Sequence, residues 1–190
     1  MIDDRFLDLL SVTCGALDDA RIIYAITGSV ASSIHGEPFD SKDIDVCLNM
    51  SEDQAKHLAE RLPQRFYRSP EAMIEAAIKK TMTNLIDSGT GFKVDLCVLP
   101  DDPFYRSVLE RRIQMPYGNG GPPFWTVTAE DIVLMKLVWR RDSRSEKQWQ
   151  NALSVVRTQF HQLDWKYLHT WADRLDVAAD LESLRRDAEA

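Results

Sequence analysis

A short apolar run that ends at a glycine and a serine is the feature that most constrains the fold of this chain. Residues 22–27 read Ile-Ile-Tyr-Ala-Ile-Thr, which is typical of a buried strand, and Gly28-Ser29 follows before a segment of helical character at 30–34. A strand is therefore expected to lead through a small-residue turn into a helix. Backbone N–H groups are free at such a turn, the helix dipole is positive there, and glycine allows a phosphate to approach closely. Gly28 and Ser29 are thus candidate phosphate-binding residues.

Two aspartates follow on a segment that alternates like a strand, Asp43-Ile44-Asp45-Val46. Residues two apart on a strand point to the same face, so Asp43 and Asp45 would project together while Ile44 and Val46 face the core. Two neighbouring carboxylates repel each other and raise each other's pKa unless a cation or a proton lies between them. Magnesium takes oxygen ligands, usually one or two carboxylates with waters and substrate phosphates. This segment therefore predicts a Mg²⁺ site.

A third carboxylate, Asp95, lies within Lys93-Val94-Asp95-Leu96-Cys97-Val98, which also alternates like a strand. The loop Ser88-Gly89-Thr90-Gly91 separates it from residues 83–87, and a glycine-bearing loop of this kind favours an antiparallel hairpin. We expect Asp95 to lie on a paired strand that could run beside the first aspartate pair.

In chain order and spacing these parts resemble the polymerase-beta-like nucleotidyltransferase superfamily, which has a glycine-serine turn, an acidic-x-acidic strand and a third acid on a neighbouring strand. The sequences around them, Thr27-Gly28-Ser29, His35-Gly36-Glu37-Pro38 and Lys42-Asp43-Ile44-Asp45, are most similar to small bacterial nucleotidyltransferases of abortive-infection and toxin-antitoxin systems. The strong resemblance covers residues 22–98, and a weaker one covers 128–137, which is similar to a helix placed over the nucleotide.

The resemblance implies an enzyme that transfers a nucleoside monophosphate from a nucleoside triphosphate to an acceptor hydroxyl, with magnesium as cofactor and pyrophosphate as product. It implies that Asp43 and Asp45 hold two metal ions, and that Asp95 binds the metal nearer the acceptor and helps to deprotonate the attacking hydroxyl. The acceptor could be RNA, a protein or a small molecule.

Three cations are candidate nucleotide ligands. Lys136 and Arg140 are four residues apart, so they would share one face of a helix and could meet the triphosphate, where positive charge offsets the phosphates. The alternative is a solvated basic face that continues through Arg141, Arg144 and Lys147. Lys42 is the third candidate. His35 fits the ordering of a loop better than the role of a base.

The remaining pattern predicts an α/β (α+β) fold, a mixed sheet flanked by helices, with a helical annex. Helices are expected over 3–20, 51–62, 69–80, 128–140 and 145–160, with two more within 164–187. The glycine- and proline-rich segment 117–123 marks the expected boundary between a nucleotidyltransferase core, 1–123, and the annex, 124–190. The tryptophans of the annex are expected to serve helix packing.

Composition and charge limit which classes of partner and which location the protein is expected to have. The net charge of −7 and the pI near 5.1 exclude a general electrostatic attraction to nucleic acid, so an RNA acceptor would need a local basic patch. No apolar run has the length of a membrane span, and residues 1–5 lack the basic and apolar regions of a signal peptide, so we expect a cytoplasmic protein without membrane contact. The three cysteines lack metal-ligand spacing and are expected to be buried thiols.

Two other classes of function remain open at this point. A non-catalytic nucleotide-binding protein, or a toxin-antitoxin partner protein of the same fold, would bind nucleotide without turnover. A two-metal nuclease would also explain clustered aspartates, but it has no need of the glycine-serine turn at a helix start.

Overall fold

The computed structural model describes residues 4–39, 41–116 and 123–189, and the chain divides into two compact units. Unit 1 contains the residues up to 26 together with 41–126, and unit 2 contains 27–40 together with 127–190. The chain thus passes from unit 1 to unit 2 and back before the first aspartate pair. The predicted division into 1–123 and 124–190 stays a prediction, and the loop at 117–122 on which it depends lies outside the described residues.

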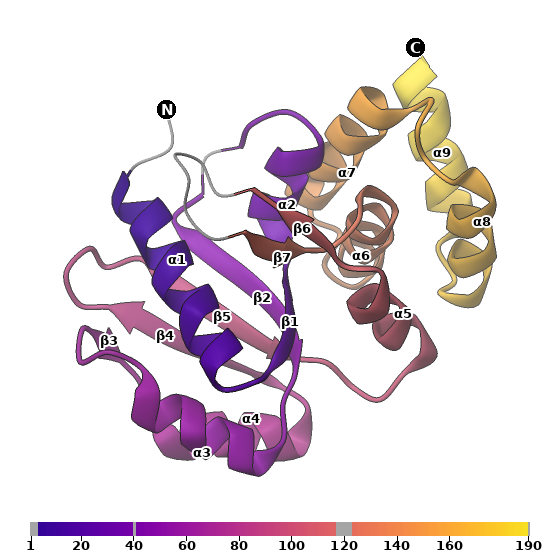
Figure 1. The fold of residues 1–190 in the computed structure, drawn as a ribbon. Coiled ribbons are helices and arrows are strands. Elements are labelled where there is room, and N and C mark those ends of the chain that lie inside the picture. The colour runs from indigo at the N-terminus through magenta and orange to yellow at the C-terminus, as the bar shows by residue number, and fades with distance from the viewer. Residues whose placement is uncertain (1–3, 40, 117–122, 190) are drawn as a thin grey trace. The chain divides into compact units, whose positions relative to one another are not determined.

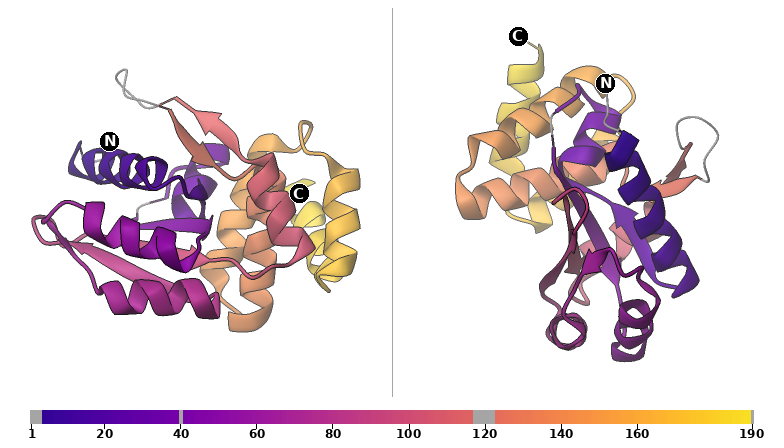
Figure 2. Two further views of the ribbon diagram at one scale, coloured as in Figure 1. Left: turned by 60° about the horizontal axis from the view of Figure 1, so that its bottom comes forward. Right: turned by 90° about the vertical axis from the view of Figure 1, so that its left-hand side faces the viewer.

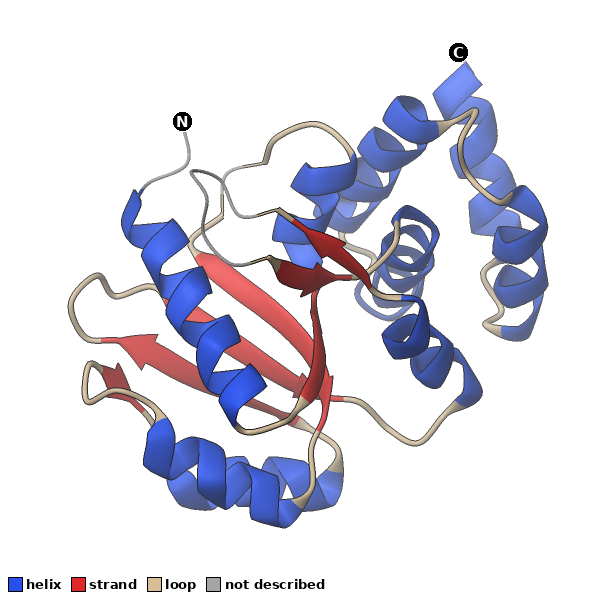
Figure 3. Ribbon diagram, viewed as in Figure 1, coloured by secondary structure: helices blue, strands red, loops and turns tan. Residues whose placement is uncertain are grey.

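Unit 1 is built on a seven-stranded mixed sheet, shown in red in Figure 3, with the strand order β3-β4-β5-β2-β1-β7-β6. The pairs β2–β5 and β1–β7 are parallel, and the other neighbouring pairs are antiparallel. The strands are β1 (Ile23–Ile26), β2 (Asp43–Asn49), β3 (Phe66–Tyr67), β4 (Met82–Asp87), β5 (Lys93–Val98), β6 (Ile113–Met115) and β7 (Phe124–Thr126). The expected mixed sheet is confirmed.

The neighbouring strands β2 and β5 each have one face that is buried along its length. On β2 the residues Ile44, Val46 and Leu48 are fully buried, and on β5 the residues Val94, Leu96 and Val98 are buried at the paired positions. The helices of unit 1 are α1 (Asp4–Asp19), α3 (Glu52–Arg61), α4 (Pro70–Lys79) and α5 (Pro103–Arg111). In this unit α1 packs on β1 and α3, while α4 packs on α3 and β4 (Figure 1).

The β4–β5 hairpin that carries Asp95 is held by a buried carboxylate. Asp87 accepts hydrogen bonds from Arg65 Nε (3.0 Å) and from the Thr90 hydroxyl (2.6 Å), and Gly91 supplies the positive φ of 74° that the loop requires. Arg65 and Thr90 hold the pKa of the Asp87 carboxyl below its usual value, although burial opposes this. The hairpin predicted from the loop at 88–91 is confirmed.

Unit 2 is helical: α2 (Gly28–His35), α6 (Ala129–Ser143), α7 (Glu146–Gln159), α8 (Trp165–Arg174) and α9 (Ala178–Glu189). In this unit α7 packs against α2, α6 and α9, as the views in Figure 2 show. The predicted helix over 128–140 begins as expected, since the Thr128 side chain accepts from the backbone N–H of Asp131 at the start of α6. The helices predicted for this part of the chain are confirmed.

The tryptophans of unit 2 pack within its helices. Each has a cation over its indole ring: Lys136 over Trp139, Arg140 over Trp149, Arg185 over Trp165 and Arg174 over Trp171. These contacts support the expected packing role.

Four of the described elements were not predicted from the sequence: β3, α5, β6 and β7.

No helix among the described residues has the length and apolar character needed to cross a membrane.

Two glycines give opposite predictions for stability. A Cβ at Gly36 would lie 2.5 Å from Ser154 Oγ and 2.9 Å from backbone atoms of Ser154 and Val155, whereas a Cβ at Gly15 in α1 would meet nothing within 4 Å. Gly36→Ala should therefore lower the free energy of unfolding by about 1–3 kcal/mol. Gly15→Ala should raise it by about 0.5–1 kcal/mol, because alanine is the better helix former. Urea unfolding of both variants measures this, and an unchanged stability of Gly36→Ala would contradict the packing of α2 on α7.

Candidate active site

The three predicted carboxylates lie on neighbouring parallel strands of unit 1. In the β2–β5 ladder, Asp45 is paired with Asp95, and Asp43 is paired with Lys93. Residues at paired positions share one face of the sheet, and this face is opposite to the buried one. Asp45 and Asp95 are half-buried, and Asp43 is exposed. The strand arrangement inferred from the alternation is confirmed, while the chemical roles of the three residues stay predictions.

The electrostatics of this face favour a bound cation. The pKa of Asp95 is raised, first by burial and then by the negative charge of Asp43, and Lys93 opposes this in part. Two residues further along the strand, burial and the charges of Asp45 and Asp95 raise the pKa of the Cys97 thiol to about 12. A divalent cation at the carboxylates would relieve this concentration of negative charge.

The donor chemistry fits magnesium with part of the predicted ligand set. Among the residues that the structure describes, no group of three histidine, cysteine, aspartate or glutamate side chains is placed to hold a metal ion. A magnesium ion needs only one or two protein carboxylates when waters and substrate phosphates complete its shell. The paired residues Asp45 and Asp95, with Asp43 beside them, can provide those carboxylate oxygens.

The predicted phosphate turn has the backbone that such a turn requires. Gly28 is the first residue of α2 and has a φ of 64°, which L side chains rarely adopt. The N-cap residue, Thr27, makes no side-chain cap hydrogen bond; its hydroxyl donates instead to Met135 Sδ (3.6 Å). Within the described part of the chain, no hydrogen-bond partner is found for the Ser29 hydroxyl. The helix start in unit 2 therefore keeps donors for an anion.

The two cations of α6 differ in their surroundings. Lys136 directly follows Met135, the residue that contacts Thr27 at the helix start, and its side chain is 3% exposed with Nζ 5.2 Å from the Trp139 ring centroid. Arg140 lies one turn further along α6, where its guanidinium pairs with Asp180 of α9 (3.0 Å). Met135 contacts Thr27 at the start of α2, and Lys136 is closer to Met135 in sequence than Arg140 is.

The remaining residues singled out from the sequence are Lys42 and His35, which lie between the helix start and the first aspartate pair in the sequence. Lys42 is exposed directly before β2, beside Asp43. His35 ends α2, is buried, and its Nε2 lies 2.8 Å from the carbonyl oxygen of Val127. A carbonyl only accepts, so this nitrogen donates, and His35 orders unit 2 as the sequence suggested.

Two residues on the carboxylate face were not singled out from the sequence. Lys93 is paired with Asp43, and Asn84 on β4 is paired with Asp95. The spacing of two between Lys93 and Asp95 could have identified the lysine, but the pairing of Asn84 depends on the hairpin register.

The cysteines are free thiols. Cys14 and Cys47 are buried, Cys97 is half-buried, and burial raises the pKa of Cys14 to about 12. Thiols held in the protonated form are poor nucleophiles. The expectation of buried thiols is met by Cys14 and Cys47 but not by Cys97.

Comparison with known proteins connects the chain to others by fold. No protein-family model matches the chain, and no curated protein matches it by sequence. Among solved structures, an antigenic nucleotidyltransferase-like protein from Paracoccidioides brasiliensis is similar with a TM-score of 0.58 at 19% identity, covering 97% of this chain and 94% of that one. The antibiotic-resistance factor ANT(2'')-Ia is similar with a TM-score of 0.58 at 12% identity, covering 99% and 97%. The chain therefore has the nucleotidyltransferase fold.

His35 gives a prediction on pH dependence. Burial lowers the pKa of His35 below its ordinary value of 6.5, so the unfolded chain binds this proton more readily than the folded protein. The stability contributed by the neutral imidazole is present above pH 6.5 and is lost as the pH falls through the lower folded pKa. We expect the unfolding free energy of the protein to fall more steeply below pH 6.5 than that of His35→Gln, which cannot titrate. Urea unfolding across this range measures the difference, and parallel profiles would contradict a buried neutral histidine.

Proposed function

We propose that this protein is a magnesium-dependent nucleotidyltransferase that moves a nucleoside monophosphate from a nucleoside triphosphate to an acceptor hydroxyl and releases pyrophosphate. The observation that carries the proposal is the pairing of Asp45 with Asp95 on adjacent parallel strands, with Asp43 on the same face. The fold shared with nucleotidyltransferase-like proteins supports it.

Chain connectivity supports a role for the glycine-serine turn. In the β1–β2 ladder Ile26 is paired with Val46, the residue after Asp45. Gly28 follows Ile26 by two residues, and two residues span at most about 7 Å. The covalent chain therefore limits how far the start of α2 can lie from the end of β1, whatever the arrangement of the two units.

In the proposed reaction, Asp43 and Asp45 would hold two metal ions, and Asp95 would bind the ion nearer the acceptor hydroxyl. Bound magnesium supplies positive charge that neutralises the triphosphate and the developing charge on the leaving pyrophosphate. Asp95 accepts a hydrogen bond from the acceptor hydroxyl and takes its proton as the hydroxyl oxygen bonds to the α-phosphorus and the bond from that phosphorus to the pyrophosphate oxygen breaks.

The other predicted residues bind the nucleotide. The N–H groups at Gly28 and Ser29, with the Ser29 hydroxyl, contact phosphate oxygens, and Lys136 offsets phosphate charge. Lys42 is proposed as an accessory contact because it is exposed beside Asp43. Arg140 stays a weaker candidate, since a nucleotide contact would compete with its ion pair to Asp180.

The subgroup we propose is that of the small bacterial nucleotidyltransferases of abortive-infection and toxin-antitoxin systems, acting in the cytoplasm. The sequences at 27–29 and 42–45 support this subgroup. The acceptor is RNA, a protein or a small molecule, and the charge of −7 means that an RNA would have to bind at a local basic patch.

Transfer can be tested without knowing the acceptor. The purified protein is incubated with each labelled nucleoside triphosphate, Mg²⁺ and fractions of a cell extract, and the fraction that gains label identifies the acceptor class. We expect label transfer with release of pyrophosphate. Saturable nucleotide binding with no label in any fraction would instead support a non-catalytic partner protein, and metal-dependent cleavage of nucleic acid without label would support a nuclease.

The carboxylates should affect different parameters. Asp45→Asn should reduce transfer to background because it removes metal-binding charge, whereas Asp95→Asn should lower the rate about 10²–10⁴-fold with little change in triphosphate affinity. Asp53→Asn is the control, since that side chain is 95% exposed on α3. Rates and titrations with a non-hydrolysable triphosphate measure both effects. Normal turnover of Asp45→Asn, or equal loss of affinity in Asp95→Asn, would refute these roles.

Lys136 should contribute to nucleotide affinity. Lys136→Met removes the charge and keeps most of the buried volume, so it should weaken triphosphate binding about tenfold, the loss expected for a hydrogen bond to a charged group. Lys147→Met removes an exposed charge of α7 and should change affinity less than about twofold. Calorimetric titration of folded variants decides this. Equal small losses that disappear in higher salt would indicate general electrostatics instead.

A further inference from the structure

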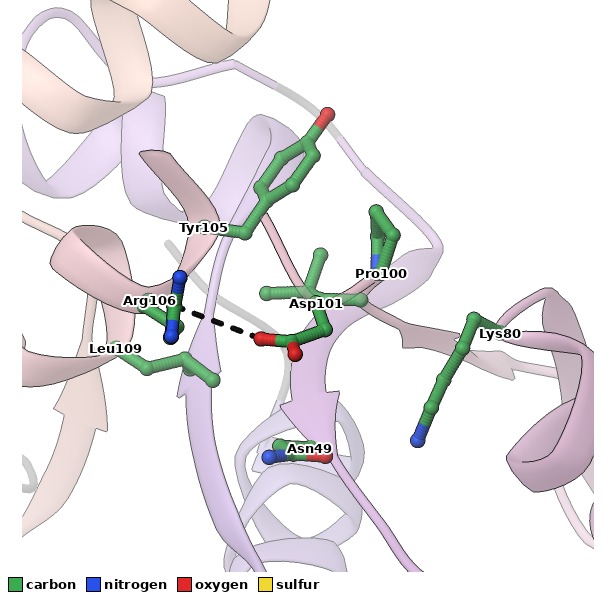
Figure 4. Close-up of a pocket in the computed structure, with 8 residues that line it drawn as sticks. Asn49, Lys80, Pro100, Asp101, Tyr105, Arg106 and Leu109 are labelled. Atoms are coloured by element: carbon green, nitrogen blue, oxygen red, sulfur yellow. Dashed lines mark ion pairs between the residues drawn. The ribbon is translucent and has the colours of Figure 1, made fainter. Parts of the chain in front are cut away.

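A cavity of about 360 Å³ lies at the carboxyl ends of the parallel strands β2 and β5, within unit 1 (Figure 4). Asn49, the last residue of β2, lines it, and Asn49 is four residues, about 13 Å, beyond Asp45 along the strand. It is therefore separate from the proposed carboxylate site. Its volume falls within the range of small-molecule sites. The lining residues are Asn49, Lys80, Leu99, Pro100, Asp101, Tyr105, Arg106 and Leu109.

The lining carries a net positive charge on a chain that is acidic overall. The charged lining residues are two cations, Lys80 and Arg106, and one carboxylate, Asp101. Lys80 and Arg106 lie on opposite sides of Asp101 in Figure 4. Arg106 Nε lies 3.5 Å from Asp101 Oδ1, and the two side chains are 61% and 83% exposed. A solvent-exposed ion pair of this kind contributes little to the stability of the protein, so a ligand anion can replace Asp101 as the partner of Arg106 at a small cost in free energy.

Lys80 occupies an unusual backbone position. It follows α4 at the C-cap with φ 53° and ψ 54°, a left-handed conformation in which glycine is the usual residue. Its Nζ donates to the carbonyl oxygen of Met50 (3.3 Å), and an ammonium group has three donors.

The rest of the lining is apolar or aromatic. Leu99 and Leu109 are 9% and 7% exposed, and Pro100 and Tyr105 complete the surface near them. The side-chain amide of Asn49 adds one polar group that can donate or accept. The lining thus combines two cationic side chains with apolar and aromatic ones.

We propose that this cavity binds a small organic anion, whose carboxylate or phosphate group takes the place of the exposed Asp101 carboxylate between Lys80 and Arg106 and whose apolar body lies against Leu99 and Leu109. The site is independent of the proposed transfer reaction, because none of its residues belongs to the predicted catalytic set. Binding, not activity, is therefore its readout.

The test is a titration of the full chain, labelled at leucine methyl groups, followed by NMR. Benzoate and phenyl phosphate supply the two anionic groups on the same ring, and benzyl alcohol is the uncharged analogue. We expect saturable shifts of the Leu99 and Leu109 methyl signals with at least one anion, and about tenfold weaker binding of benzyl alcohol. The anion that binds with the higher affinity shows whether the cavity prefers a carboxylate or a phosphate group. Equal binding of the neutral analogue, or no saturable shift of these methyls with either anion, would overturn the proposal.

Charge-removing variants locate the anion. Both variants should fold, because asparagine tolerates the left-handed conformation at position 80 and Arg106 is exposed. Each removes one positive charge, so Lys80→Asn and Arg106→Gln should each weaken anion binding about fivefold to tenfold. Lys79→Gln is the matched control, because Lys79 pairs with Glu75 and does not line the cavity. If Lys80→Asn does not fold, Arg106→Gln carries the test alone. Affinity that is unchanged in Arg106→Gln, or lowered equally in Lys79→Gln, would contradict the assignment.

Discussion

The continuous buried apolar face of β2 and β5 is the constraint on which the proposed site depends. Ile44, Val46 and Leu96 are fully buried, while the aspartates between them lie on the other face. A slip of one residue in either strand would turn a carboxylate into the core, where an unpaired charge is very costly. The packing of apolar residues therefore fixes the register that pairs Asp45 with Asp95. The site is in this sense a consequence of the core.

Local signals in the sequence were sufficient for most elements and for the carboxylate face. The alternation around Asp43 and Asp95 and the loop at 88–91 act over a few residues, and so does the capping box of Ser51 and Gln54 at the start of the helix predicted over 51–62; the structure confirms these elements. Strands of two or three residues, such as β3 and β7, are too short to show a period. Helix α5 was within reach, because Asp102 accepts from the N–H of Phe104 and proline opens the helix.

Other features depend on contacts that sequence spacing does not reveal. The spacing of four between Lys136 and Arg140 correctly suggested a shared helix, but not that Lys136 is buried or that Arg140 pairs with Asp180. The grouping of residues 27–40 with the C-terminal helices is likewise non-local, since α2 packs against α6 and α7. The cavity between the strand ends and α5 requires the fold itself, because its lining comes from four separate segments.

Metal binding at the paired aspartates is the central claim, and paramagnetic relaxation tests it directly. Mn²⁺ replaces magnesium in oxygen-ligand sites. In the presence of a non-hydrolysable nucleoside triphosphate, Mn²⁺ should broaden the backbone amide signals of residues 43–46 and 94–96 more than any others. Strongest broadening elsewhere, for example around the surface residues Asp19, Asp53 and His57, or no localised broadening, would contradict the account.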